Sequence, residues 1–221
     1  MKMQSFILSN VLALLLTSGS LVSQSCQMAV QTTTSGDQGL IVEGLLMKLA
    51  ESNDKFFTVE EGMIQGAMGH LRGYCIAPPP PAETFSDDLH YLSQAVPDFT
   101  YEVDSINSNI VHIIDGRLAR HESYALDEIT SLTFDGSVER LVGALHANGI
   151  PVSAGGAFDS HEFMFIDRGS QVRVRANGLA VRSILSDFLP LKGRGRMLWR
   201  AETELGSDKT CYVRFRGAPR S

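Results

Sequence analysis

The sequence predicts an α+β fold in which short helices pack on small mixed sheets and a β-α-β unit is repeated. Three observations predict this fold. Strand-like and helix-like apolar patterns alternate along the chain of 221 residues. Each predicted helix carries a single apolar stripe, which has to lie against a sheet. The composition, with 43% hydrophobic and 20% charged residues, is that of a chain with a buried core.

The first 25 residues have the features of a signal peptide. Lys2 precedes an interrupted apolar run from Phe6 to Leu16, and small polar residues follow it. A membrane span takes about 20 apolar residues, so this run is too short to be one. We expect cleavage after Ser25 and export to the periplasm or the medium; the alternative is a buried N-terminal helix. Cys26 would begin the mature chain, and a lipid anchor there is a further alternative, although the residues before it make a poor lipobox.

The rest of the chain divides into a polar lead-in and two halves. Residues 26–38 show no apolar periodicity and form the lead-in. Residues 39–125 are the N-terminal α+β half, and residues 126–221 are the C-terminal half. Within the first half, the four prolines Pro78–Pro81 cannot lie inside a helix or a central strand, so we expect a stiff connector there.

In the N-terminal half, apolar spacing and turn residues predict the elements in order. They are a helix over 40–49, a strand over 56–59, a helix that begins after an N-cap at Ser86 and ends at Pro97, and a β-hairpin of strands 99–103 and 110–114.

The C-terminal half shows a strand, a turn and a helix twice. One helix carries the stripe Val138, Leu141, Val142 and Leu145, after a strand over 129–134 and a turn at Asp135–Ser137. The other carries the stripe Val181, Ile184, Leu185 and Phe188, after a strand over 172–174 and a turn at Asn177–Gly178. Strands over 197–201 and 211–215 follow. We expect the stripes to be buried and Glu139, Arg140 and Arg182 to face solvent.

Two segments of this half, 132–152 and 172–189, resemble the secretin and TonB short N-terminal domain. In that family a strand leads through a Gly-containing turn to a helix with an apolar stripe, and a small β-α-β unit is repeated. The resemblance covers residues 126–216, and residues 83–115 look like a further related half. It implies a non-catalytic, periplasmic interaction domain. No secretin domain or receptor barrel follows residue 221, so we expect no pore or transport role.

The charges are unevenly distributed. From Arg168 to the end, 12 Lys and Arg residues stand against 4 Asp and Glu, whereas residues 26–167 hold 6 against 21. One interpretation is that two solvated halves attract each other; the other is an anion-binding or nucleic-acid-binding surface at the basic end. The candidate residues for that site are Arg194, Arg196, Trp199 and Arg200, and the alternative for them is a cationic hairpin turn. We do not expect nucleic acid as the partner.

The histidines form no zinc motif such as HExxH, and we expect neither a metal nor a cofactor. A small secreted hydrolase that uses His161 with Asp159 or Glu162 is an alternative function. The GxSxG element of serine hydrolases is missing from the sequence.

Cysteine usage adds an expectation that depends on export. Disulfides persist outside the cytoplasm, so Cys75 and Cys211 could link an early segment to the last strand; the alternative is two buried free thiols. As a whole, the sequence predicts a secreted or periplasmic, non-catalytic interaction module of the bacterial cell envelope. Its expected partner is a protein or an envelope polymer, and the mature chain is expected to lack a membrane span.

Overall fold

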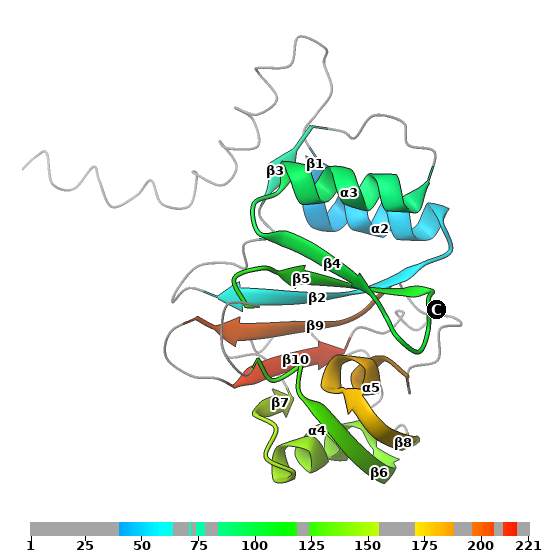
Figure 1. Cartoon of the computed structure of the whole chain (residues 1–221), viewed down its shortest axis with the longest axis vertical. Helices are drawn as coiled ribbons and strands as arrows, with labels where there is room; N and C mark the ends of the chain where they lie inside the picture. Colours follow the sequence, from blue (N-terminus) through cyan, green and yellow to red (C-terminus); the bar gives the residue numbers. More distant parts are fainter. Residues whose placement is uncertain are drawn as a thin grey trace, which may run out of the picture.

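Helices and mixed sheets make up the part of the chain that the structure, a computed structural model, describes, and the predicted α+β class is confirmed (Figure 1). The described residues are 40–63, 71, 74–77, 84–118, 124–154, 171–187, 196–205 and 210–215. Outside them lie the predicted signal peptide (residues 1–25), the predicted lead-in (residues 26–38) with Cys26, the predicted proline connector, and the segments that contain Asp159, His161, Glu162 and Arg194. None of the described helices is long and apolar enough to cross a membrane.

The elements follow one another in two runs. The first run is β1 (Leu40–Ile41), α2 (Val42–Ser52), β2 (Phe56–Met63), β3 (Cys75–Ile76), α3 (Phe85–Ala95), β4 (Phe99–Val103) and β5 (Ile110–Asp115). The second run is β6 (Ile129–Ser137), α4 (Val138–Ala147), β7 (Val152–Ala154), β8 (Gln171–Ala180), α5 (Val181–Asp187), β9 (Met197–Glu204) and β10 (Cys211–Phe215). We call the first run unit 1 (residues 40–115) and the second run unit 2 (residues 129–215).

The two units have the same order of elements and the same strand pairing. In each unit the first and third strands pair antiparallel, as β1 with β3 and β6 with β8. The second strand pairs in parallel with the last, as β2 with β5 and β7 with β10. The last two strands form an antiparallel hairpin with a matching register: Val103 lies opposite Val111, and 100 residues further along Thr203 lies opposite Cys211.

A parallel pairing of β2 with β9 joins the two three-stranded sheets into one, in the order β4-β5-β2-β9-β10-β7. Because side chains alternate along a strand, each strand of this sheet contributes side chains to both faces. Phe57 and Val59 of β2 pack with α2 and α3, whereas Trp199 and Ala201 of β9 pack with α4 and α5. The helices of the two units therefore cover opposite faces of the shared sheet (Figure 1). We call the β2–β9 pairing, with the side chains between it and α5, the seam.

Helix α3 begins at a capping box, two residues earlier than predicted. The N-cap is Thr84 rather than Ser86. The Asp87 amide donates to the Thr84 hydroxyl at 3.2 Å, and the Thr84 amide donates to the Asp87 carboxylate at 3.1 Å. This reciprocal arrangement satisfies two amides that a helix start otherwise leaves without partners, so it places the N-cap at Thr84.

The turns predicted before α4 and α5 are wrong, because strands β6 and β8 run directly into the helices. The first predicted turn, Asp135–Ser137, lies in the antiparallel β6–β8 ladder, where Gly136 is opposite Val172. Asn177 and Gly178 also belong to β8, but they lie where the register of the ladder shifts, and the Gly178 amide donates to the Ser131 hydroxyl at 3.0 Å. Gly178 does have a backbone conformation typical of turns, because its φ of +64° is one that few residues other than glycine adopt.

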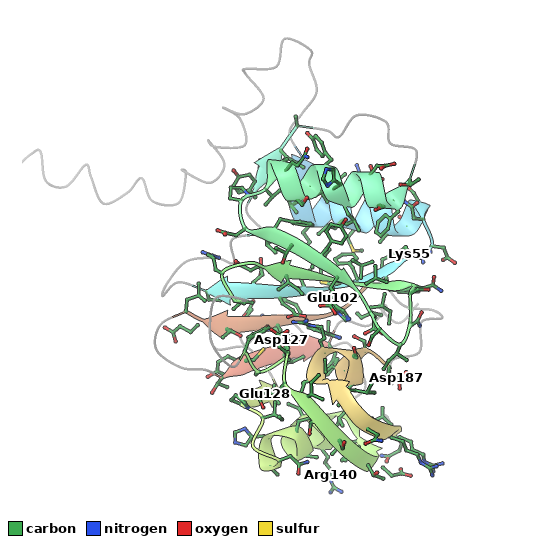
Figure 2. All side chains as sticks on the ribbon, viewed as in Figure 1. Lys55, Glu102, Asp127, Glu128, Arg140 and Asp187 are labelled. Atoms are coloured by element: carbon green, nitrogen blue, oxygen red, sulfur yellow. The ribbon has the colours of Figure 1, made fainter. Side chains whose placement is uncertain are left out.

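Both helical stripes are buried in the core of unit 2, as expected. The buried residues are Leu141, Val142, Leu145, Val181, Ile184 and Leu185. Arg140 is exposed, also as expected, and points away from the molecule on α4 (Figure 2). The expectation for Arg182 is wrong, since this side chain is only 6% exposed. The side chains of Glu139 and Val138, and residue Phe188, lie outside the description.

The predicted Cys75–Cys211 disulfide is also wrong. Cys211 is a free thiol on β10, and its side chain is buried in the core of unit 2 beside the Tyr124 hydroxyl, 3.9 Å away. Burial raises the pKa of this thiol to about 12, so it stays protonated at neutral pH. Cys75 lies on β3, in the small sheet of unit 1, and forms a disulfide with a cysteine other than Cys211.

The core assignment predicts which truncations on the helices of unit 2 cost stability. Leu141→Ala and Ile184→Ala each remove a fully buried side chain and should lower the free energy of unfolding by about 2–5 kcal/mol. Arg140→Ala on the exposed face of α4 is the matched control and should cost less than about 0.5 kcal/mol. Urea denaturation of the three variants measures this. Equal losses for Leu141→Ala and Arg140→Ala would contradict the assignment.

Candidate functional site at the seam

Helix α5 lies across the seam, and its first turn is anchored by the segment that connects the two units. The amides of Val181 and Arg182 donate to the carbonyls of Glu128 and Leu126 at 3.0 and 3.1 Å. These are backbone donors that a helix start leaves without partners inside the helix. The connecting segment therefore fixes where α5 begins, and it aims the side chain of Arg182 at strand β2.

Arg182 is the centre of a buried ion cluster that bridges the units. Its Nε and Nη2 donate to the two carboxylate oxygens of Glu60 on β2, at 2.9 and 3.0 Å. Its Nη1 donates to Glu102 on β4 at 3.0 Å, and Nη2 also contacts the carboxylate of Asp127. Planar, two-bond pairing of a guanidinium with a carboxylate is the strongest geometry that such a pair adopts.

The electrostatics of the cluster follow from burial and pairing. Burial raises the pKa of Glu60, and the adjacent Arg182 charge opposes that rise. Burial by itself would lower the pKa of Arg182, but the Glu60 and Asp127 carboxylates raise it above its ordinary value. Each charge thus depends on the other: without Arg182, the wholly buried Glu60 carboxylate would have no counter-charge in direct contact.

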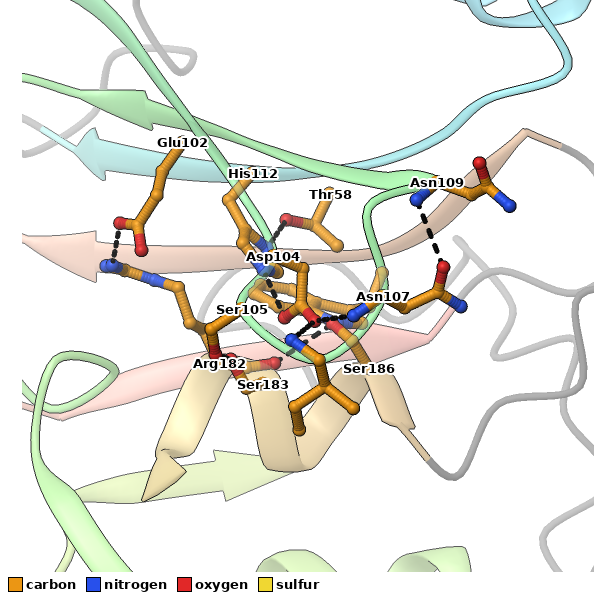
Figure 3. Close-up of polar contacts among 12 residues, drawn as sticks. Thr58, Glu102, Asp104, Ser105, Asn107, Asn109, His112, Arg182, Ser183 and Ser186 are labelled. Carbon is orange, nitrogen blue, oxygen red and sulfur yellow. Dashed lines mark hydrogen bonds and ion pairs between the residues drawn. The ribbon is translucent and has the colours of Figure 1, made fainter. Parts of the chain in front are cut away.

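Beside the ion cluster, a hydroxyl, an imidazole and a carboxylate lie in line (Figure 3). The Thr58 hydroxyl is 2.8 Å from His112 Nδ1, and His112 Nε2 is 2.9 Å from Asp104 Oδ2. A carboxylate accepts, so Nε2 carries a proton and donates to Asp104, while Nδ1 shares a hydrogen bond with the Thr58 hydroxyl. Thr58 and His112 come from the neighbouring strands β2 and β5, where they are opposite each other in the register.

Asp104 is held by its own loop, between β4 and β5. Its Oδ1 accepts from the amides of Ile106 and Asn107, both at 2.8 Å. Burial alone would raise the pKa of Asp104, but the hydrogen bonds from His112, from these two amides and from Ser183 lower it to about 2. The carboxylate is therefore ionised at neutral pH, and it ties the loop of unit 1 to α5 of unit 2.

Trp199, on β9 of unit 2, lies beside His112 and contacts helix α5. Its indole N–H donates to the Ser186 hydroxyl at 3.0 Å, and that hydroxyl donates to the Arg182 carbonyl at 2.9 Å. The ring centroids of Trp199 and His112 are 6.1 Å apart, within aromatic contact distance. Strands β2, β5 and β9 and helix α5 thus meet in one hydrogen-bonded layer.

The order hydroxyl, imidazole, carboxylate is the one that nucleophilic hydrolases use, because the imidazole can take the hydroxyl proton. Chemistry of that kind needs substrate within reach of the hydroxyl oxygen. Thr58 and His112 are both 0% exposed. In this conformation the Thr58 hydroxyl is closed off from solvent, and the three groups, which all belong to unit 1, form a hydrogen-bonded array inside the fold.

The predicted basic site is not assembled in the structure. Arg196 pairs with Asp54 at 2.7 Å and lies over the Phe56 ring, 5.1 Å from its centroid. Trp199 is buried among the α4 and α5 side chains, whereas Arg200 is buried on the opposite face, beside α2. The reason is strand alternation: neighbouring residues of β9 point to different faces of the sheet. The proposal of a shared surface formed by Trp199 and Arg200 is therefore wrong, and Arg194 lies outside the described residues.

The space beside Arg200 is too small for a ligand. It is a cavity of about 10 Å³ between α2 and strands β2 and β9, lined by Val42, Leu46, Glu61 and Arg200 among others. A cavity of this size holds about one water molecule. Within the described part of the chain, no three His, Cys, Asp or Glu side chains are placed to hold a metal ion.

The residues of the seam were not predicted as a site from the sequence, because the sequence patterns that mark them are weak. Glu60 directly follows an apolar strand pattern, and a carboxylate in line with such a strand is unusual enough to search for a buried cation. Arg182 lies between Val181 and Ser183 on a helix whose described residues are buried all round except the last, Asp187. His112 alternates with apolar neighbours, which predicted that it faces the other side of the sheet but not what covers that side.

Comparison with protein-family models, curated proteins and solved structures finds no match to the chain.

The ion cluster predicts a large loss when Arg182 is removed alone. Arg182→Met should lower the free energy of unfolding by about 3–5 kcal/mol, because the Glu60 carboxylate stays buried without its partner. The double variant Arg182→Met, Glu60→Leu should recover most of this loss. Arg173→Met breaks an exposed pair with Asp135 and should cost less than about 1 kcal/mol. Urea denaturation tests all three; an Arg182→Met loss no larger than that of Arg173→Met would contradict the role.

The Asp104 contacts predict a pH dependence. Its pKa of about 2 in the folded chain lies below the ordinary value of 3.8, so its contribution is complete above about pH 4 and disappears as the pH falls towards 2. Asp104→Asn should therefore lower the free energy of unfolding by about 2 kcal/mol at pH 7, and its difference from the parent should shrink to near zero at about pH 2. Urea denaturation across this range measures it, with Asp135→Asn on the exposed pair as control. A loss that is independent of pH would refute the assignment.

Proposed function

We propose that the protein is a non-catalytic interaction module of the bacterial cell envelope, exported to the periplasm or the medium. The observation that carries the proposal is how the described polar groups are used. The ion cluster joins the two units, and the Thr58–His112–Asp104 array is enclosed within unit 1. In the described part of the chain, the shared sheet ends in strands β4 and β7, each of which pairs with one neighbour. Unpaired strand edges bind extended segments of other proteins.

Strand β4 has the properties of such an edge. Its outer residues are solvent-facing: Val103 is 50% exposed, and Ile106, in the loop that follows, is 43% exposed. Large apolar side chains at an open edge favour contact with a protein rather than with a small polar molecule. The acidic Glu102, which precedes Val103 on β4 and is half exposed beside Arg182, adds a charge that selects among partners (Figure 3).

The cell-envelope address is supported by the sequence. The apolar run over residues 6–16 has the features of a signal peptide. The resemblance to the secretin and TonB short N-terminal domain implies periplasmic interaction domains built from repeated strand and helix units. The proposal needs no cofactor, and it names no envelope protein or polymer as the partner.

Site-specific photo-crosslinking in a bacterium that exports the full chain tests both parts of this proposal. A photoreactive residue at Val103, on the β4 edge, should give a discrete protein adduct in the envelope fraction. The same residue at Arg140, exposed on α4, is the control and should give none. Mass spectrometry of the exported protein should find a start near Cys26. No adduct at either position would count against the interaction role, and an intact Met1 outside the cytoplasm would count against the signal peptide.

A further inference from the structure

The two outer strands of the described shared sheet, β4 and β7, correspond to the two strands that pair at the seam, β9 and β2. By element order and pairing, β4 of unit 1 is the counterpart of β9 in unit 2, and β7 is the counterpart of β2. Inside the chain, β2 and β9 bind each other in parallel. In the part of the chain that the structure describes, each molecule therefore carries a second set of the same two edges, on which no further strand pairs.

The backbone groups of β4 point outward at the positions that bind β2 in unit 2. The Asp98 carbonyl accepts from the Gly116 amide and the Asp104 amide donates to the Ile110 carbonyl, so even-numbered residues of β4 face β5. The backbone of Tyr101 and Val103 then faces away from the sheet. On β9 the odd-numbered residues from Ala201 onward face β2, as the bond from the Leu205 amide to the Met63 carbonyl indicates; before the register shift in this pairing, the Arg196 carbonyl faces β2 instead.

The same comparison holds for β7 and β2. The Cys211 amide donates to the Pro151 carbonyl, so the backbone of Val152 and Ala154 faces away from β10. The Val152 amide donates to the Ile150 carbonyl of its own chain at 2.7 Å, so the outward amide of β7 is that of Ala154. In unit 1 the corresponding residue is Phe57, which lies opposite Val111 as Val152 lies opposite Cys211. Its amide is turned to β9, where it donates to the Arg196 carbonyl at 2.8 Å.

We propose that β7 of one copy of this protein pairs in parallel with β4 of a second copy, and so repeats between molecules the β2–β9 contact that joins the units. This inference rests on the proposed function and names the partner as a second copy of the chain. The two surfaces in such a contact differ, so the contact does not close into a two-fold dimer and successive copies add head to tail.

Charge favours this head-to-tail contact over a pairing of β4 with β4. Unit 1 contains 3 Lys and Arg residues against 12 Asp and Glu, whereas unit 2 contains 11 against 9. A β7–β4 contact places the acidic unit 1 beside the slightly basic unit 2 of the next copy. A symmetric β4–β4 pairing would instead bring two acidic units and their Glu102 side chains together, which is repulsive.

Sedimentation velocity of the full mature chain tests the proposal. The described part of β7 is three residues long, so the contact is small and self-association should be visible only towards high, near-millimolar concentration. The weight-average sedimentation coefficient should rise with concentration. Tyr101→Pro and Ala154→Pro each remove one outward amide and leave the hydrogen bonds of the existing ladder intact. Each variant alone should stay monomeric. A mixture of the two should form dimers that do not grow further.

The mixture distinguishes a head-to-tail contact from other contacts. The Tyr101→Pro variant retains its β7 edge and the Ala154→Pro variant retains its β4 edge, so together they should form a one-to-one dimer that does not grow. Lys48→Ala, exposed on α2, is the control and should associate like the parent. Circular dichroism checks the fold of each variant. Val103→Lys, which places a charge on the same edge, replaces Tyr101→Pro if that chain is unfolded.

Three results would overturn the proposal: a monomeric parent over the whole concentration range, association that both proline variants retain, or no dimer in their mixture. The failure of this inference is distinct from that of the proposed function. Crosslinking at Val103 that yields only an adduct with another envelope protein would refute self-pairing and leave the interaction role intact. A homodimer adduct at Val103, absent in the Ala154→Pro background, would support self-pairing.

Discussion

The structure depends on the two-bond contact between Arg182 of one unit and Glu60 of the other. Because the helices of the units cover opposite faces of the shared sheet, α5 has to lie over a strand that belongs to unit 1. A buried carboxylate on that strand requires a cation, and α5 supplies it. Removing either unit would leave a charge uncompensated in the interior. The contact thus makes the two units one cooperative domain, in which neither is expected to remain folded without the other.

The fold class and most elements could be predicted from the sequence, because they follow from local apolar periods. The stripes of α4 and α5 and the hairpin β4–β5 are examples. The wrong predictions involve contacts that periodicity does not encode. Gly136 signalled a turn, but cross-strand pairing with Val172 keeps it in a strand, and Gly178 lies in β8 where the register shifts. Arg182 was assigned to solvent, since no pattern on its own helix announces an acidic partner 122 residues away. The site was missed for this reason.

Polar contacts at the seam also restrict how the sheets can join. A shift of β2 against β9 would separate Glu60 from Arg182, whose helix packs on β9, and would move His112 away from Trp199. The polar contacts therefore favour one register of this pairing. Within unit 1, the hydrogen bonds of Thr58, His112 and Asp104 hold β2, β5 and the β4–β5 loop in one arrangement.

Trp199 is the single tryptophan of the chain, and it lies in this layer, fully buried and within aromatic contact of His112. The near-ultraviolet emission of the protein therefore originates from one known place. Water that enters between the units would shift this emission to longer wavelength. The chain thus contains its own optical probe of whether its two halves are joined, and following their separation in real time requires no added label.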